Sequence, residues 1–201
     1  MGTIIRSFNF MDDEIFKILF TAHVRSHLEY AGQIWFPYMK KDITAIENVQ
    51  RRATRMLPGM SNLDYPARLR RLKLPTLTYR RTRGAMIETY KIFHKYDRST
   101  APNLVLSTSN TRGHNFKLFM PRSLKSHPKS HFFASRIVAP WNSLPYDVVN
   151  SPSIKTFEAR LDRWWRDQPF KYDHNSSLDP RSSPQHRNLN REENSDLEIV
   201  A

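Results

Sequence analysis

Three groups of side chains in this sequence have types and spacings that could carry chemistry. Asp12 and Asp13 are adjacent carboxylates behind an apolar residue, an arrangement suited to holding Mg²⁺. His23 and His27 stand four residues apart, which would place two imidazoles on one helix face as metal ligands. The third group is a concentration of arginine and lysine between residues 51 and 91, which could bind a polyanion.

The acidic pair and the histidine pairs each have a simpler structural explanation. Asp12 and Asp13 precede an apolar stretch with helical spacing, and carboxylates at a helix start accept hydrogen bonds from the free amides of the first turn. No glutamate follows His23, and neither this pair nor His127 and His131 has a third ligand nearby. The sequence therefore predicts no metal and no cofactor. A metal at the aspartate pair beside a third carboxylate is the least favoured alternative.

No other motif indicates catalysis. Five glycines are too few for a strong phosphate-binding loop, and the chain shows no nucleophile elbow or Ser-His-Asp arrangement. Cysteine is absent, which excludes a thiolate nucleophile, a thiolate metal site and a disulfide framework. We therefore expect a binding protein and not an enzyme.

Positive charge is the most informative chemical feature of the chain. Its 201 residues carry a formal net charge of +13, with 39% hydrophobic residues to form a core. Such a charge favours nucleic acid first and an anionic membrane surface second over a merely solvated basic surface. No apolar run is long enough to span a bilayer, and we expect no membrane partner. The predicted phosphate contacts are Arg51, Arg52, Arg55, Arg70, Arg71, Lys73, Arg80, Arg81 and Arg83.

The first of two amphipathic helices must position the cations from Arg51 to Arg55. It has a candidate N-cap in Asp42, apolar residues every three or four positions, and a stop at Pro58–Gly59. Glu47 lies four residues before Arg51, so these two side chains are expected to pair.

The second helix is expected to start near Pro75, a residue suited to a first helical turn, and to extend through Lys91. Gly84 in its interior lowers helix propensity but permits the close approach of a neighbour. Residues 61–74 form a short basic connector in this interpretation, with Asp64 capping a turn.

The rest of the chain is expected to add further helices and little β-structure. An apolar helix runs from Asp12 towards Pro37, and a short strand precedes Pro121. Ser151, followed by Pro152, is expected to cap another helix. The predicted fold is mainly α, with a helical bundle at 1–98, a linker at 99–130, a small helical C-terminal extension at 131–170 and a disordered tail at 171–201.

Four blocks of the sequence, taken in order, resemble the region downstream of the polymerase palm in reverse transcriptases of jockey-like, LINE-type non-LTR retrotransposons. The blocks are VRSHLEYAGQIWFPYMKKDITAIENVQRRATRML, LDYPARLRRLKLPTLTYRRTRGAMIETYKIF, RGHNFKLFMPRS and FFASRIVAPWNSLPYDVVNSPSIKTFEARLD. The resemblance covers about residues 2–163. It is specific because several long blocks occur at the expected separations.

The resemblance implies a thumb-like helical bundle with a C-terminal extension. In the family this region holds template RNA and the primer–template duplex, and A-form duplexes are held through backbone and shape. The catalytic aspartates that bind Mg²⁺, the palm and fingers that carry them, and the endonuclease are not matched by these blocks. We therefore expect a non-catalytic C-terminal fragment without polymerase activity. Its expected partners are RNA, an RNA–DNA hybrid or DNA, and the palm and fingers of a parent polymerase.

A second hypothesis assigns the helices a purely structural role. In that case the chain is a remnant, inactive in catalysis and in binding, whose helices serve to dock on a polymerase palm. The family's target-primed synthesis implies a nuclear location, whereas the basic runs are too diffuse for a localisation signal, so a cytoplasmic location stays open.

Overall fold

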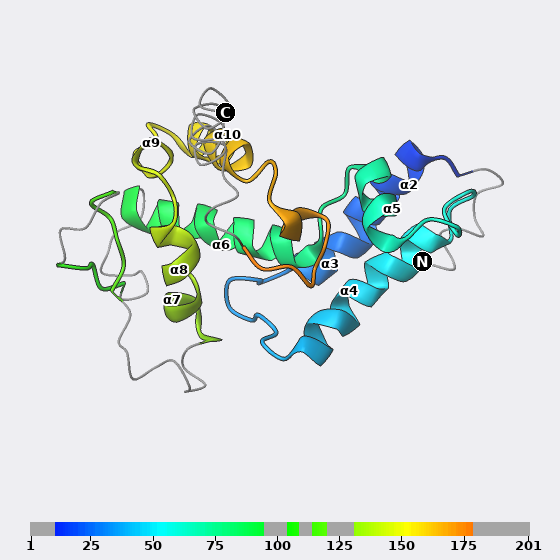
Figure 1. The fold of residues 1–201 in the computed structure, drawn as a ribbon, viewed down its shortest axis with the longest axis horizontal. Coiled ribbons are helices and arrows are strands. Elements are labelled where there is room, and N and C mark those ends of the chain that lie inside the picture. The colour runs from blue at the N-terminus through cyan, green and yellow to red at the C-terminus, as the bar shows by residue number, and fades with distance from the viewer. Residues whose placement is uncertain (1–10, 95–103, 109–113, 120–130, 179–201) are drawn as a thin grey trace, which may run out of the picture.

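A computed structural model describes residues 11–94, 104–108, 114–119 and 131–178 of the chain. Within these ranges the protein is mainly α-helical, and its β-structure consists of an isolated antiparallel bridge between Leu106 and Leu118. The predicted mainly α fold class is therefore confirmed (Figure 1). The predicted strand before Pro121 is reduced, in its described part, to this single bridge.

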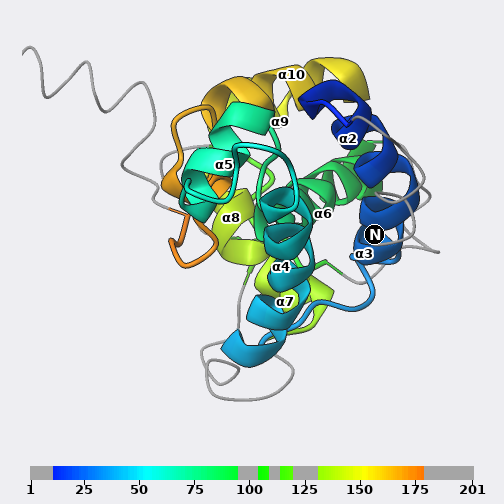
Figure 2. The same ribbon diagram turned by 90° about the vertical axis from the view of Figure 1, so that its right-hand side faces the viewer.

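The long helix α6 lies at the centre, with α7 to α9 towards one end of the molecule and α2, α4 and α5 towards the other (Figure 1). Figure 2 looks from the second of these ends and shows α4 and α5 in front of α6. The bounds are α2 Asp13–Phe20, the π-helical turn η1 Thr21–Arg25, α3 Ser26–Glu29, α4 Lys40–Arg55, α5 Tyr65–Leu72, α6 Leu77–His94, α7 Phe133–Arg136, α8 Val138–Asn142, α9 Tyr146–Val149, α10 Ile154–Trp164 and the 3₁₀ turn η4 Pro169–Lys171.

Two hydrophobic cores hold the helices together. The first joins α2, α4 and α5 through side chains such as Phe16, Ala53 and Leu69. The second joins α6 to residues 137–170, and α6 contributes Tyr79, Ala85, Met86 and Tyr90 to it. The boundary between the two cores therefore falls after Leu74, inside the predicted 1–98 unit. Helix α6 shares its core with the predicted C-terminal extension.

Three helices begin with a side chain that accepts a first-turn amide. Asp12 accepts from Ile15 N at 2.7 Å and Asp64 from Ala67 N at 2.7 Å, so these two of the three predicted capping aspartates do cap. The predicted turn behind Asp64 is a full helix, α5, because its apolar residues repeat at helical spacing towards the first core.

Two predicted caps are wrong. Helix α4 begins at Lys40, with Met39 as N-cap, so Asp42 lies inside its first turn and complements the helix dipole there. Ser153, not Ser151, caps α10 by accepting from Thr156 N at 3.2 Å. The Ser151 hydroxyl is buried and donates to the Val148 carbonyl at 2.7 Å, closing α9 instead.

We expect Ser153→Ala to lower the free energy of unfolding by about 1 kcal/mol, because it removes the side-chain acceptor for the first turn of α10. Urea denaturation of the two chains measures the difference. Ser153→Asp is the matched control, since aspartate caps as well as serine. Equal stabilities of the wild type and the alanine variant would contradict the assignment.

The ordered body extends beyond the predicted limit at Phe170. Thr76 joins the start of α6 to this region, donating its amide to the Lys171 carbonyl at 2.9 Å and its hydroxyl to the Phe170 carbonyl at 2.8 Å. Leu178 packs against the second core. The remainder of the predicted tail, 179–201, lies outside the described residues, as does His127.

Residues 30–39 connect α3 to α4 without helical structure. Arg136 holds this loop by donating to the carbonyls of Gly32 and Gln33 at 2.8 and 2.9 Å. Close packing occurs at Gly32, where an added Cβ would lie 3.2 Å from the Glu29 carbonyl oxygen. At Gly84, where close packing was predicted, the nearest atom to such a Cβ is 3.9 Å away.

Among the described helices, none combines the length and the hydropathy required to cross a bilayer.

Candidate nucleic-acid interface

The predicted phosphate contacts on α6 are bound to protein groups. Arg80 pairs with Glu29 on α3, with Nη2 and Oε2 2.9 Å apart. Arg83 forms a fork with Asp162 on α10 at 2.6 and 2.9 Å, and this hydrogen bonding raises the pKa of Arg83. Both arginines therefore tie α6 to its neighbours.

Arg81 is the most enclosed of the predicted contacts, with 5% of its surface exposed. It donates to the Leu28 carbonyl, and its guanidinium carbon lies 3.9 Å from the ring centre of Trp35. Burial lowers the pKa of Arg81. This side chain holds the 30–39 loop against α6 and does not face an external ligand.

The three predicted contacts on and after α5 are exposed. Arg71 pairs with Asp13 at 3.1 Å, a surface ion pair of small expected energy. Arg70 lies over the ring of Tyr172 at 5.9 Å. Lys73 ends α5 with a left-handed backbone at φ 53°. These cations contribute positive charge to the surface beside α5.

The three predicted contacts on α4 form no ion pair with a carboxylate in the described part of the chain. Arg52 and Arg55 are exposed, and neither forms an ion pair with any carboxylate of the described residues. Arg51 is partly buried, with its guanidinium carbon 5.0 Å from the ring centre of Tyr65. The predicted pairing of Arg51 with Glu47 is wrong, because the Glu47 carboxylate turns inward and binds Tyr65.

Glu47 is a buried acceptor shared by three helices. Its carboxylate accepts from the Tyr65 hydroxyl at 2.6 Å and from the Leu77 amide, the first of α6, at 3.0 Å. Gln50 donates to the same hydroxyl at 3.2 Å and to the Pro75 carbonyl at 3.0 Å. Burial raises the pKa of Glu47. This network fixes the positions of α4 and α5, and with them the arginines of both helices.

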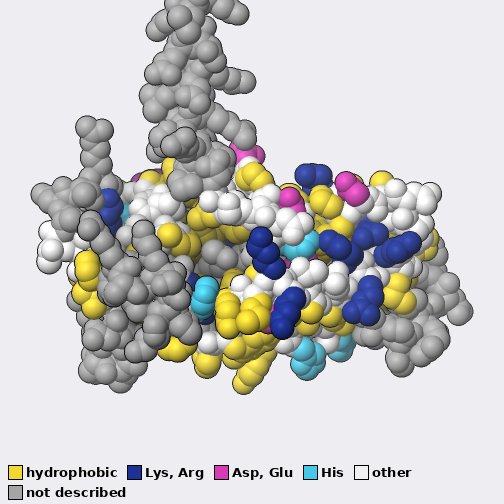
Figure 3. Space-filling view, turned by 60° about the horizontal axis from the view of Figure 1, so that its bottom comes forward, with side chains coloured by type: hydrophobic (Ala, Val, Ile, Leu, Met, Phe, Trp, Pro, Cys, Tyr) yellow, Lys and Arg dark blue, Asp and Glu magenta, His cyan; other side chains and the backbone are white. Residues whose placement is uncertain are grey.

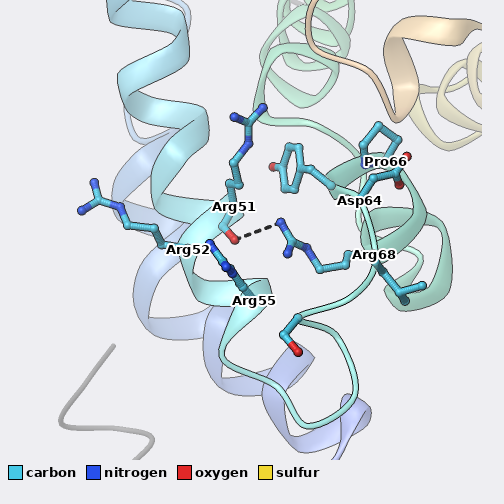
Figure 4. A pocket seen from close by; sticks show the side chains of 9 residues that line it. Arg51, Arg52, Arg55, Asp64, Pro66 and Arg68 are labelled. Atoms are coloured by element: carbon cyan, nitrogen blue, oxygen red, sulfur yellow. Dashed lines mark hydrogen bonds between the residues drawn. The ribbon is translucent and has the colours of Figure 1, made fainter.

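The arginines of α4 line a pocket between α4 and α5, which we call the α4–α5 pocket (Figure 4). Its volume is about 450 Å³, and it is lined by Arg51, Arg52, Arg55, Ser61, Leu63, Asp64, Tyr65, Pro66 and Arg68. Four arginines and a single carboxylate, Asp64, therefore line this hollow. Figure 3 shows lysine and arginine side chains gathered over the half of the molecule that holds these two helices.

Arg68 is the residue of this pocket that sequence reasoning missed. It is only 4% exposed, and its guanidinium carbon lies 5.7 Å from the Tyr65 ring centre. Burial, and next the positive charge of Arg55, lower the pKa of Arg68. The helical spacing of Arg68 with Tyr65 and Leu72 could have placed it on the inner face of α5, had residues 64–72 been predicted as a helix.

The other groups considered for chemistry lie apart from this pocket. Asp12 caps α2 and Asp13 pairs with Arg71, while His23 and His27 are exposed. Within the described residues, no three His, Cys, Asp or Glu side chains are grouped closely enough to hold a metal ion. The arrangement can bind an anion, and it shows no donor set for a metal-dependent reaction in that part of the chain.

Comparison of the chain with protein-family models, with curated proteins and with solved structures finds no match. The functional interpretation of the α4–α5 pocket therefore depends on its geometry and charge.

Proposed function

We propose that the chain binds nucleic acid without catalysis, as the thumb-like, post-palm helical region of a retrotransposon RNA-directed DNA polymerase of the non-LTR type. The ligand is template RNA or the primer–template duplex. The observation that carries the proposal is the set of four arginines that line the α4–α5 pocket, none of which pairs with a described carboxylate.

The guanidinium groups of these side chains are well suited to binding the phosphate groups of a nucleic acid. A guanidinium presents planar pairs of N–H donors that match two phosphate oxygens. Arg70 and Lys73 extend the positive charge along the exposed side of α5. Contacts to phosphates position a duplex but do not read its sequence, so we expect binding with little sequence preference.

The test is fluorescence-anisotropy binding of the whole chain to a labelled RNA–DNA hybrid across a salt series. If the pocket arginines engage phosphates, the logarithm of the association constant should fall linearly with the logarithm of salt concentration, with a slope of about −0.9 for each phosphate engaged. A hybrid of scrambled sequence is the control and should bind equally. Absence of binding by a chain with native near-UV circular dichroism would contradict the proposal.

A second candidate function follows from the apolar side chains of the 30–39 loop. Ile34 is 87% exposed and Tyr30 77% exposed, and Tyr38 is 54% exposed beside them. Exposed apolar residues on one loop mark an interaction surface. In this alternative the helices dock on a polymerase palm and bind no nucleic acid. A folded chain that binds the dye ANS and no hybrid would favour it.

A further inference from the structure

Three arginines besides Arg52 line the α4–α5 pocket, and they come from two helices. Arg51 and Arg55 come from successive turns of α4, and Arg68 comes from α5. Figure 4 shows the Arg68 side chain pointing from α5 towards α4, while Arg52 points to the outside. The inner part of the pocket therefore belongs to Arg51, Arg55 and Arg68.

Donor groups in this inner part lack acceptors. The Nε atoms of Arg51 and Arg68 are buried and have no hydrogen-bond partner within the described structure. Arg68 donates through Nη2 to the Arg51 carbonyl at 3.5 Å, the outer limit of a hydrogen bond (Figure 4). Buried charged donors normally have a hydrogen-bond acceptor, so the Arg68 guanidinium can still donate a hydrogen bond to an acceptor on a ligand.

The charge of the pocket is also unbalanced. The guanidinium carbons of Arg51 and Arg68 lie 5.0 and 5.7 Å from the ring centre of Tyr65, so two like charges share one aromatic ring. The Asp64 carboxylate at the rim already accepts the Ala67 amide at 2.7 Å as the cap of α5. An anion between the arginines would relieve their repulsion and supply acceptors for their unpaired N–H groups.

We propose that the α4–α5 pocket seats a single phosphate group, with Arg51, Arg55 and Arg68 donating to its oxygens and Arg52 at the rim. The natural source of that group, a phosphodiester of a nucleic-acid strand, rests on the proposed function. A tetrahedral phosphate offers several oxygens to guanidinium forks that approach from two helices, whereas a carboxylate or chloride cannot satisfy all three arginines. Tyr65, fixed by its hydrogen bond to Glu47, holds two of these forks in place.

Two readouts on the full-length chain test this site. The first is the thermal midpoint in sodium phosphate against sodium acetate and sodium chloride at equal ionic strength. The second is the affinity for the RNA–DNA hybrid at one salt concentration. Arg55→Gln is the main variant, because Arg55 is exposed and we expect its replacement to leave the fold intact. Arg70→Gln is the matched control, an exposed arginine of α5 outside the pocket lining. Arg68→Lys keeps the charge and removes the fork.

We expect phosphate alone to raise the thermal midpoint of the wild type, and both pocket variants to lose most of that shift. Hybrid affinity should fall at least about tenfold in Arg55→Gln and less than about threefold in Arg70→Gln. Arg68→Lys should lose affinity for the hybrid although its net charge is unchanged, if it retains the native circular dichroism.

The two proposals fail in different ways. In the first case, Arg55→Gln and Arg70→Gln bind the hybrid with equal affinity, and the thermal midpoints in phosphate, acetate and chloride are equal. This result overturns the phosphate site and leaves nucleic-acid binding in place. Phosphate-specific stabilisation that Arg55→Gln abolishes, without any hybrid binding, supports the phosphate site and overturns the proposed function.

Discussion

Glu47→Ala should lower the free energy of unfolding by about 3 kcal/mol, the largest loss expected from any single change considered for this protein. The alanine removes a carboxylate that accepts from the Tyr65 hydroxyl and the Leu77 amide, and both donors are buried. Each would then be left without an acceptor away from water. Denaturant unfolding at neutral pH, extrapolated linearly to water, measures the loss.

Glu47→Gln is the control, since it keeps one acceptor oxygen and removes the charge. Burial raises the pKa of Glu47 above its ordinary value of 4.5. Between pH 4.5 and the folded-state pKa, the folded state therefore keeps a proton on Glu47 that the unfolded state has released. The wild type should therefore lose stability relative to Glu47→Gln as the pH rises from 4.5 through the folded-state pKa. Parallel pH profiles of the two chains, or a loss below about 1 kcal/mol in Glu47→Ala, would contradict this account.

Local patterns predicted those parts of the fold that depend on neighbours in the sequence. The apolar spacing of residues 43–57 predicted α4, and Asp12 and Asp64 were recognised as caps because an acceptor before an apolar run is a local signal. Which of Ser151 and Ser153 caps α10 could not be decided from the neighbouring sequence. Both precede α10, and Ser151 is used by the end of α9, which sequence spacing alone does not reveal.

The candidate site was predicted only in part, because burial and pairing are set by distant residues. Charge density placed the predicted contacts in the stretch that also contains the α4–α5 pocket, yet Arg80 and Arg83 find their carboxylates on α3 and α10, at Glu29 and Asp162. No periodicity connects residues so far apart. Arg68 was missed for the opposite reason, since α5 was predicted as a turn and its inner face was not assigned.

The double variant Arg52→Gln, Arg55→Gln should bind an RNA–DNA hybrid roughly a hundredfold more weakly than the wild type at about 0.1 M salt. Both arginines are exposed on α4 and free of carboxylate partners within the described residues, so both are available to phosphate. Losing these contacts should also make the salt slope shallower, by about 0.9 for each phosphate released. Glutamine keeps the helix propensity, so the fold of α4 is preserved.

The matched comparison is Arg80→Gln, Arg83→Gln, which removes the same charge from α6. These side chains pair with Glu29 and Asp162, so their loss should lower stability but change the salt slope by less than about 0.5. Charge alone would make the two double variants equivalent, because they differ in position and not in net charge. A larger loss of affinity in the α6 variant would place the interface on α6. A larger loss in the α4 variant would show that pairing inside the fold selects which arginines meet the ligand.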